Sequence, residues 1–231
     1  MALATVARGP DDASTMRTLF PPWTNTAFRV ALAGAALAPI AGVSLLMLYA
    51  RSPLHDDMAR PVVQPVDFDH RHQVVDDGID CRYCHSIVES SSSAGVPSPA
   101  VCMSCHSQIW NKSPILDPVR HAYFTGEPLV WKRVHRLPDF VYFDHSIHAA
   151  KGVGCESCHG RVDRMAAIQK VEPLTMGFCL DCHRDPAPRL RPRDAVTLMG
   201  WKPVGDPRLL GEELESRCDV HTRTSCTACH R

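Results

Sequence analysis

The chain has 231 residues, with 25 basic and 25 acidic side chains. This balance argues against nucleic acid as a partner, because such a partner calls for a strongly basic surface. A hydrophobic share of 45% is ordinary for a folded chain and excludes the disordered and collagen-like classes. The counts of 11 Cys and 13 His are unusual, and they indicate either a disulfide scaffold or a protein that binds metal or another prosthetic group.

An apolar run follows a polar tail, residues 1–29. Residues 30–50 contain no charged side chain and are bounded by Arg29 and Arg51. A helix needs about 20 apolar residues to span a bilayer, so we predict a single transmembrane helix over 30–50. The alternative is a cleaved secretory signal peptide. Against it, the run is longer than a usual signal-peptide core, and Leu48-Tyr49-Ala50 makes a poor cleavage site.

The remaining residues, 51–231, form the predicted second domain. They show little helical or strand periodicity, so we expect a mainly α fold with little regular structure. Two units, about 66–106 and 141–183, each begin with Phe-Asp-His and each contain two Cys-x-x-Cys-His motifs. A connection over 184–217 leads to a fifth motif at 226–230. Self-similarity of this kind indicates duplicated structural units.

The five Cys-x-x-Cys-His motifs use 10 of the 11 cysteines. Their cysteines are Cys81, Cys84, Cys102, Cys105, Cys155, Cys158, Cys179, Cys182, Cys226 and Cys229, and their histidines are His85, His106, His159, His183 and His230. This motif attaches c-type haem, because the two thiols reach the vinyl groups of one porphyrin and the adjacent His ligates the iron. Zinc or redox chemistry explains paired cysteines but not the histidine after each pair. We therefore predict five covalently bound haem c groups, with the chain wrapped around them.

Haem attachment also predicts the topology. In bacteria, covalent attachment to such motifs takes place outside the cytoplasmic membrane. Residues 51–231 are therefore expected in the periplasm and residues 1–29 in the cytoplasm. The prediction is a single-pass protein of the bacterial inner membrane.

Eight histidines lie outside the motifs, and the five haems need up to five distal ligands. His145 and His148 stand three residues apart just before a haem motif. In multihaem cytochromes of the c3 and c7 type, such a pair serves one haem of its own unit and one neighbour. His70 is the equivalent in the first repeat, but its companion His72 comes two residues later, and Gln73 occupies the expected position.

Two further candidates lie elsewhere. His135 belongs to the segment between the repeats, and we include it among the distal ligands. Met176 precedes Cys179 by three residues, and the alternatives of iron ligation and simple packing against a haem both stay open. His221 can be a ligand or a solvated loop side chain. The residues interpreted as structural or free are His55, His121 and the thiol of Cys218.

Several stretches resemble the pentahaem, membrane-anchored cytochrome c subunit of bacterial alternative complex III. They are Phe68–His70, Gly78–His85, Val101–His106, Val134–His135, Leu137–His145, Met176 and Cys179–Arg184. The resemblance covers roughly residues 20–231 and is strongest over 66–186. The order of one membrane helix followed by five haem motifs also agrees, and the pattern departs from the family at His72-Gln73.

The resemblance implies an electron-transfer subunit of a quinol:acceptor oxidoreductase complex, not an enzyme by itself. Its implied partners are an iron–sulfur subunit, polytopic quinol-binding subunits, a monohaem cytochrome, the lipid bilayer and a periplasmic acceptor. That acceptor would be a soluble cytochrome c or a copper or iron–sulfur carrier. The alternative is an anchored quinol dehydrogenase cytochrome that binds quinol itself and feeds a periplasmic reductase. A terminal multihaem reductase is a third class, and it requires a haem with an open distal position.

Overall fold

The computed structural model describes residues 19–230. Most of the expected cytoplasmic tail, residues 1–18, lies outside the described residues. The chain divides into two compact units, Met1–Arg51 and Ser52–Arg231. Each unit is described by itself below.

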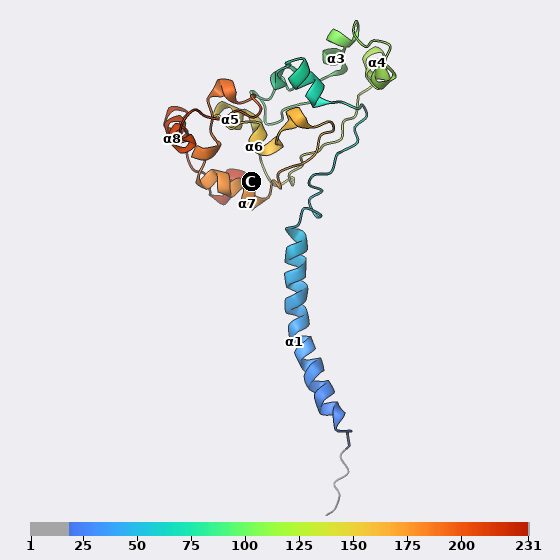
Figure 1. The fold of residues 1–231 in the computed structure, drawn as a ribbon, viewed down its shortest axis with the longest axis vertical. Coiled ribbons are helices and arrows are strands. Elements are labelled where there is room, and N and C mark those ends of the chain that lie inside the picture. The colour runs from blue at the N-terminus through green and yellow to red at the C-terminus, as the bar shows by residue number, and fades with distance from the viewer. Residues whose placement is uncertain (1–18, 231) are drawn as a thin grey trace, which may run out of the picture. The chain divides into compact units, whose positions relative to one another are not determined.

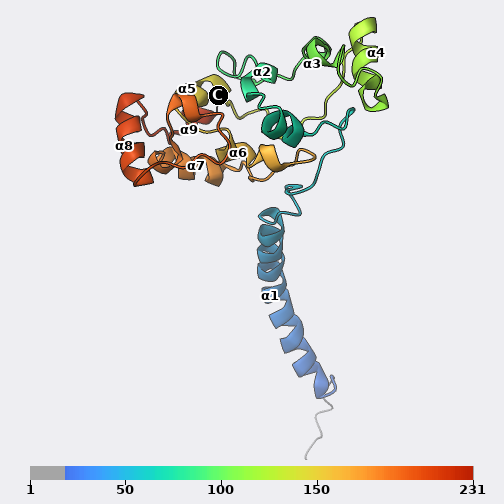
Figure 2. The same ribbon diagram turned by 45° about the horizontal axis from the view of Figure 1, so that its top comes forward.

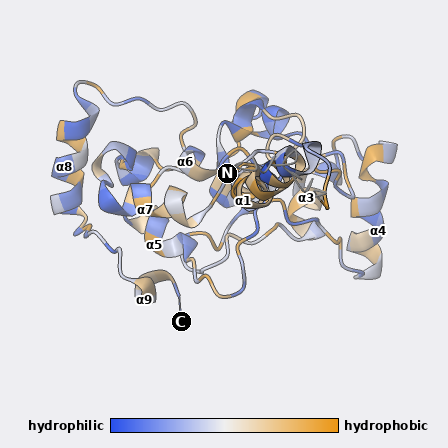
Figure 3. Ribbon diagram, turned by 90° about the horizontal axis from the view of Figure 1, so that it is seen from below, coloured by the Kyte–Doolittle hydropathy of each residue, from blue (hydrophilic) through white to orange (hydrophobic). Residues whose placement is uncertain are grey.

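The first unit contains one long helix, α1 (Trp23–Ala50), of 28 residues (Figure 1). It begins at Trp23 rather than at Val30, directly after Pro22, and proline is well accepted at the start of a helix. A second proline, Pro39, lies inside α1. Its mean hydropathy reaches 2.1 over an 18-residue window, and none of its side chains is buried. Figure 3, which views α1 end-on, shows its predominantly hydrophobic colouring. In length and composition α1 is able to cross a membrane, as the sequence predicts.

The second unit is mainly helical, and within residues 19–230 no β-strand forms. Its α-helices are α2 (Cys81–Cys84), α3 (Pro99–His106), α4 (Asp117–Thr125), α5 (His145–Ala150), α6 (Glu156–His159), α7 (Met176–Arg184), α8 (Pro207–Arg217) and α9 (Cys226–Cys229). A π-helical turn covers His72–Asp76, and 3₁₀ turns cover Pro114–Leu116, Val162–Arg164, Ala187–Arg189 and Arg193–Ala195. Extended backbone pairs only at isolated bridges in this part of the chain. The predicted class, mainly helical with little regular structure, is confirmed.

The helices of the second unit spread from α4 at one end to α8 at the other (Figure 2). In this view α3 and α2 follow α4, α6 lies between the two ends, and α5, α7 and α9 lie toward α8. At the α4 end, a small hydrophobic cluster joins α3 to α4. Its buried members are Val66, Met103, Leu116 and Val119.

The connection between the second repeat and the fifth motif packs back onto the second repeat. The Arg191 backbone N–H donates to the carbonyl of Gly152 at 2.9 Å. A Cβ at Gly152, whose φ is +85°, would lie 2.5 Å from the Arg191 carbonyl oxygen. A Cβ at Gly154 would overlap the Arg191 guanidinium. Glycine is therefore required at position 152, and a side chain at position 154 would displace the Arg191 guanidinium.

Candidate haem attachment sites

Each of the five motifs lies on a helical turn. The first and fifth coincide with α2 and α9, the second ends α3, the third coincides with α6 apart from its first cysteine, and the fourth lies within α7. Residues three apart on a helix share one face, so the two thiols of each motif point to the same side. That is the arrangement that two thioether bonds to one porphyrin require. The Asp80 carboxylate caps the first of these turns by accepting from the Arg82 N–H at 2.8 Å.

All eleven cysteines lie in the described part of the chain, and each is a free thiol there. Free paired thiols are the form that bonds to porphyrin vinyl groups. Over residues 19–230, no three His, Cys, Asp or Glu side chains converge as the ligands of a metal ion. A structural zinc site needs four such ligands, whereas a haem iron takes only one or two from the protein. The donor set of these motifs therefore fits haem.

Three motif histidines are oriented by backbone carbonyls. Nδ1 of His85 donates to the Gly95 carbonyl at 2.8 Å, and Nδ1 of His106 donates to the Ile109 carbonyl at 3.2 Å. Nδ1 of His230 donates to a carbonyl in the same way, at 3.1 Å. This bond fixes the tautomer that carries the proton on Nδ1 and leaves the Nε2 lone pair available for an iron.

The same bond orients the two histidines of α5. Nδ1 of His145 donates to the Ser92 carbonyl at 2.8 Å, and Nδ1 of His148 donates to the Asp144 carbonyl at 2.7 Å. The Asp144 side chain caps α5 by accepting from the Ser146 N–H at 2.8 Å. Two side chains that the sequence placed three residues apart are thus held on one short helix with their Nδ1 atoms occupied.

Ring separations relate these distal candidates to the motif histidines. The centroids of His145 and His159 are 6.3 Å apart, and those of His148 and His183 are 6.1 Å apart. An iron bound at roughly 2 Å by an imidazole on each side separates the ring centroids by about 6 Å. The ring of His135 lies only 4.3 Å from that of His159, which is too close to share an iron between them.

Burial keeps several of these imidazoles neutral. It lowers the pKa of His159 to about 3, and the positive charges of His135 and His145 add to the effect. It lowers the pKa of His70 to about 4, where the charge of His85 adds and that of Asp69 opposes. The neutral imidazole is the form that ligates a metal.

Two buried imidazole nitrogens have no hydrogen-bond partner among the described residues, Nδ1 of His70 and Nε2 of His135. Leaving such an atom unsatisfied costs free energy. In His135 the unpartnered atom is the Nε2 that would bind iron. This unsatisfied atom is a second point on which the residues fit a haem.

The structure places the other candidates in different surroundings. Nδ1 of His72 lies 3.2 Å from an Asp76 carboxylate oxygen, and its ring stacks on Trp110 with centroids 5.6 Å apart. Met176 is the first residue of α7 and is 64% exposed. His221 is exposed and contacts the Asp219 carboxylate at 2.8 Å. None of these contacts places the side chain beside a motif histidine.

Sequence reasoning missed a buried ion pair beside the third motif. The guanidinium of Arg191 donates to the carboxylate of Glu156 at 2.9 Å and to the Leu198 carbonyl at 3.0 Å. It also lies over the Trp201 ring, with its carbon atom 5.3 Å from the centroid. The signal was faint, because Glu156 is a variable position of a haem motif and Arg191 lies in a segment interpreted as a connection.

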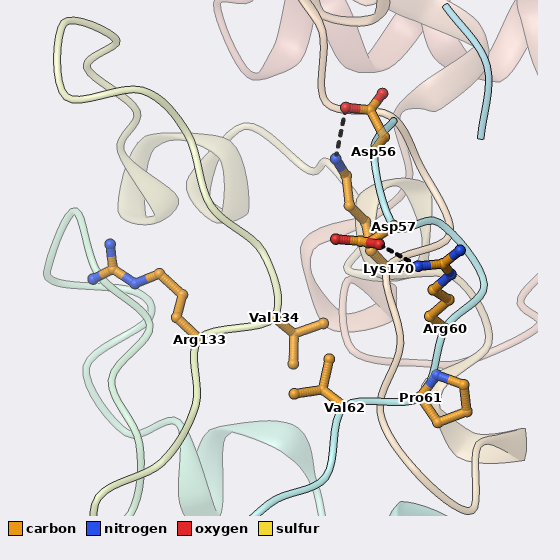
Figure 4. A pocket seen from close by; sticks show the side chains of 8 residues that line it. All are labelled: Asp56, Asp57, Arg60, Pro61, Val62, Arg133, Val134 and Lys170. Carbon is orange, nitrogen blue, oxygen red and sulfur yellow. Dashed lines mark hydrogen bonds and ion pairs between the residues drawn. The ribbon is translucent and has the colours of Figure 1, made fainter. Parts of the chain in front are cut away.

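A cavity of about 340 Å³ lies next to His135 in the chain (Figure 4). Its apolar wall is formed by Pro61, Val62 and Val134, and its charged wall by Asp56, Asp57, Arg60, Arg133 and Lys170. Figure 4 shows two ion pairs in it, Lys170 with Asp56 and Arg60 with Asp57. Arg133 lies apart from both pairs on the opposite side.

The apolar side chains of the second unit also fit large flat cofactors. Across residues 19–230, only 11 hydrophobic residues are buried. Many larger ones stay exposed near the motifs, including Tyr83, Ile87, Ile109, Trp110, Phe140, Ile147 and Leu198. Such side chains can pack against porphyrin faces. This packing is needed if porphyrins, rather than protein side chains, form the apolar interior.

Comparison with known proteins agrees with this site. Residues 141–231 match the family described as cytochrome c7 and related cytochrome c. The chain is also similar to the menaquinone reductase multiheme cytochrome c subunit of Nitratidesulfovibrio vulgaris, with 37% identity over 97 residues. That alignment covers 42% of this chain and 45% of the relative, so the chain spans less than half the length of the curated relative it matches.

Residues 141–231 of the second unit therefore resemble a cytochrome c7-like multihaem domain, and cytochrome c domains of this kind hold haem c covalently. The matched family and the similar relative are both c-type cytochromes, a class of protein that transfers electrons.

Proposed function

We propose that this cytochrome is a membrane-anchored carrier of five haem c groups and an electron-transfer subunit of a quinol-oxidising complex. The complex would be of the alternative complex III kind and would deliver electrons to a periplasmic acceptor. The observation that carries the proposal is the set of five Cys-x-x-Cys-His motifs, each on a helical turn and all within one unit. The relative's connection with menaquinone supports the link to a quinol.

The proposal assigns ligands to the haems. The ten motif cysteines would form the thioether bonds, and the five motif histidines would each ligate an iron. His145 would be the second protein ligand of the third haem and His148 of the fourth, in keeping with their separations of 6.3 and 6.1 Å from His159 and His183. His70 serves the first haem, because the charge of His85 acts on it. The distal candidates without an assigned haem are His72, His135 and Met176.

The anchor and its orientation are part of the proposal. At 1.5 Å per residue, the 28 residues of α1 extend about 42 Å, enough to cross a bilayer. Because haem c is attached outside the cytoplasmic membrane, residues 51–231 would lie in the periplasm of a bacterial inner-membrane protein. The partners would be an iron–sulfur subunit, polytopic quinol-binding subunits and a monohaem cytochrome.

The chain's own residues have defined tasks in this function. When bound, the haems supply one-electron oxidation and reduction. Backbone carbonyls hold the imidazoles by their Nδ1 atoms, so each ring keeps one orientation. Burial of His159 and His148 lowers the pKa of each ring and keeps it neutral, which prevents protonation from competing with ligation. Paired histidine ligands give low reduction potentials, which suits electrons that come from a quinol.

Purification from membranes tests the proposal. We expect intact-mass measurement to count five haems on the chain, and mass spectrometry of the mildly solubilised sample to find the partner subunits with it. The double substitution Cys226→Ala and Cys229→Ala should lower the count to four, whereas Cys218→Ala, the matched control outside the motifs, should leave it at five. Isolation of the cytochrome alone, in every detergent tried, would contradict the complex.

The cavity beside His135 favours a second candidate function, quinol binding by this chain itself. Its lining begins at Asp56, six residues after Ala50, the last residue of the anchor helix. Apolar walls can hold a quinol ring, and a carboxylate such as Asp56 can accept a quinol proton.

Substitution of a wall residue tests this alternative. If the purified chain oxidises a quinol analogue, Val62→Trp should abolish that activity by filling the cavity. Val63→Trp is the matched control, because Val63 is 74% exposed and does not line the cavity. Quinol oxidation only by the intact complex rules this alternative out.

A further inference from the structure

The second haem motif contacts the first. The hydroxyl groups of Tyr83 and Ser104, which occupy variable positions of the two motifs, are hydrogen-bonded at 2.9 Å. These two motifs are therefore neighbours in space as they are in the chain.

The first motif also contacts the third, which is not its neighbour in the chain. The Thr197 hydroxyl donates to the Asp80 carboxylate at 2.7 Å, directly before the first motif. The preceding residue, Val196, accepts from the Cys155 N–H at 3.0 Å. The loop after the first motif meets the same region, because Ser92 accepts from Nδ1 of His145. One short segment thus holds the first and third motifs together.

The third motif contacts the fourth through α5. His145 faces His159 of the third motif, and His148, three residues later, faces His183 of the fourth. The third and fourth motifs are neighbours.

The fifth motif returns to the start of the second repeat. The Tyr142 N–H donates to the Cys229 carbonyl at 2.8 Å, and Nδ1 of His230 donates to the Phe140 carbonyl at 3.1 Å. Phe143, the residue after Tyr142, stacks on the ring of His148 with centroids 4.4 Å apart, and His148 faces His183 of the fourth motif. The fifth motif is therefore connected to the fourth through the residues that lead into α5.

Exposure of the motif cysteines gives an independent indication. Two of the ten are exposed, Cys105 of the second motif and Cys226 of the fifth, and the other eight are partly buried. Figure 2 shows the corresponding helices, α3 and α9, on the two sides of α6. The second and fifth motifs stand at the two ends of this order of contacts, and they are the motifs with a cysteine open to solvent.

Resting on the proposed five haems, we infer that they form one line in the order second, first, third, fourth, fifth, and that electrons enter and leave at the second and fifth. The first haem is thus an internal link, although its motif comes first in the chain. The second haem is a terminal port.

Removal of single haems distinguishes this order from chain order. The first haem is removed by Cys81→Ala with Cys84→Ala, and the second by Cys102→Ala with Cys105→Ala, in the full chain purified in detergent. After a laser pulse has reduced about one haem per molecule, internal redistribution is followed by absorbance. Removal of the first haem should isolate the second haem from the other three. Electrons on the second haem should then redistribute at least 100-fold more slowly. Removal of the second should leave the fast phase among the remaining four.

Chain order predicts the opposite pair of results, and either that outcome or equal effects in the two variants would overturn the inference.

A milder pair of variants covers the case in which a haem-deleted chain does not fold. His85→Met and His106→Met keep the haem attached and raise its reduction potential.

In redox titrations, His85→Met should shift the potentials of two other haems and His106→Met of only one, because an internal haem has two neighbours. The reverse numbers would support chain order. Intact mass separates the two levels of failure. A wild-type chain with fewer than five haems contradicts the proposed function, whereas five haems with the chain-order pattern contradict the inferred line alone.

Discussion

Replacement of Arg191 by Met should destabilise the second unit by about 3 kcal/mol, because the loss of one partner of a buried ion pair typically costs about 3–5 kcal/mol. The side chains of Arg191 and Glu156 are only 8% and 16% exposed, and their charged atoms are 2.9 Å apart. We take the lower end of the range, because Glu156 keeps two other contacts. Its carboxylate accepts from the Gly200 N–H at 2.5 Å and lies 3.9 Å from the Arg161 guanidinium.

Urea unfolding of the haem-loaded chain in detergent measures this cost. With a denaturant slope of about 3 kcal/mol per molar urea, the midpoint should fall by roughly 1 M. Arg208→Met is the matched control, because Arg208 forms an ion pair of 2.6 Å with Asp185 but both side chains are about half exposed, at 53% and 51%. Exposed pairs contribute about 0–1 kcal/mol.

A double substitution completes the argument. Arg191→Met with Glu156→Gln should recover part of the lost stability, because it leaves no uncompensated charge beside the third motif. If Arg191→Met lowers the midpoint no more than Arg208→Met does, the buried pair is not a major support of this region and the reasoning is wrong.

Three further predictions follow from the site. His145→Gly should convert one low-spin haem to high spin in the EPR spectrum and added imidazole should reverse the change, whereas His221→Gly should leave the spectrum unaltered. The pKa of Asp80 is lowered to about 2, first by its hydrogen bond with Arg82, so the folded chain holds fewer protons on this group than the unfolded chain. The stability from Asp80 is therefore full above pH 4 and is lost as the pH falls towards 2, and this loss should be absent from Asp80→Asn in urea midpoints measured against pH. Alkaline carbonate should leave the full chain in the membrane pellet, and its release would contradict the anchor.

Much of the candidate site is local and was therefore open to prediction from the sequence. A spacing of two residues between cysteines places both thiols on one helical turn wherever the turn lies in the fold. His145 and His148 were predicted as distal ligands on similar grounds, from three-residue spacing just before a motif. The apolar stretch that becomes α1 is equally local, although the helix begins at Trp23, earlier than the apolar run itself.

Other features depend on contacts that no local pattern contains. From the sequence we interpreted residues 184–217 as a connection. In the structure, residues within this segment hold the first and third motifs together. His135 and His145 were both candidates as distal ligands, and only the ring separations of 4.3 and 6.3 Å from His159 distinguish them.

The proposed chemistry of this protein can be inferred from local sequence alone: five Cys-x-x-Cys-His motifs, one apolar stretch and little periodicity in the rest of the chain. Which motifs are in contact depends on the tertiary structure. The bonds that join them connect residues 21 positions apart, Tyr83 and Ser104, and 117 positions apart, Asp80 and Thr197. Contacts at such separations depend on how the whole chain closes its loops and packs, so they leave no mark in the spacing of neighbouring residues.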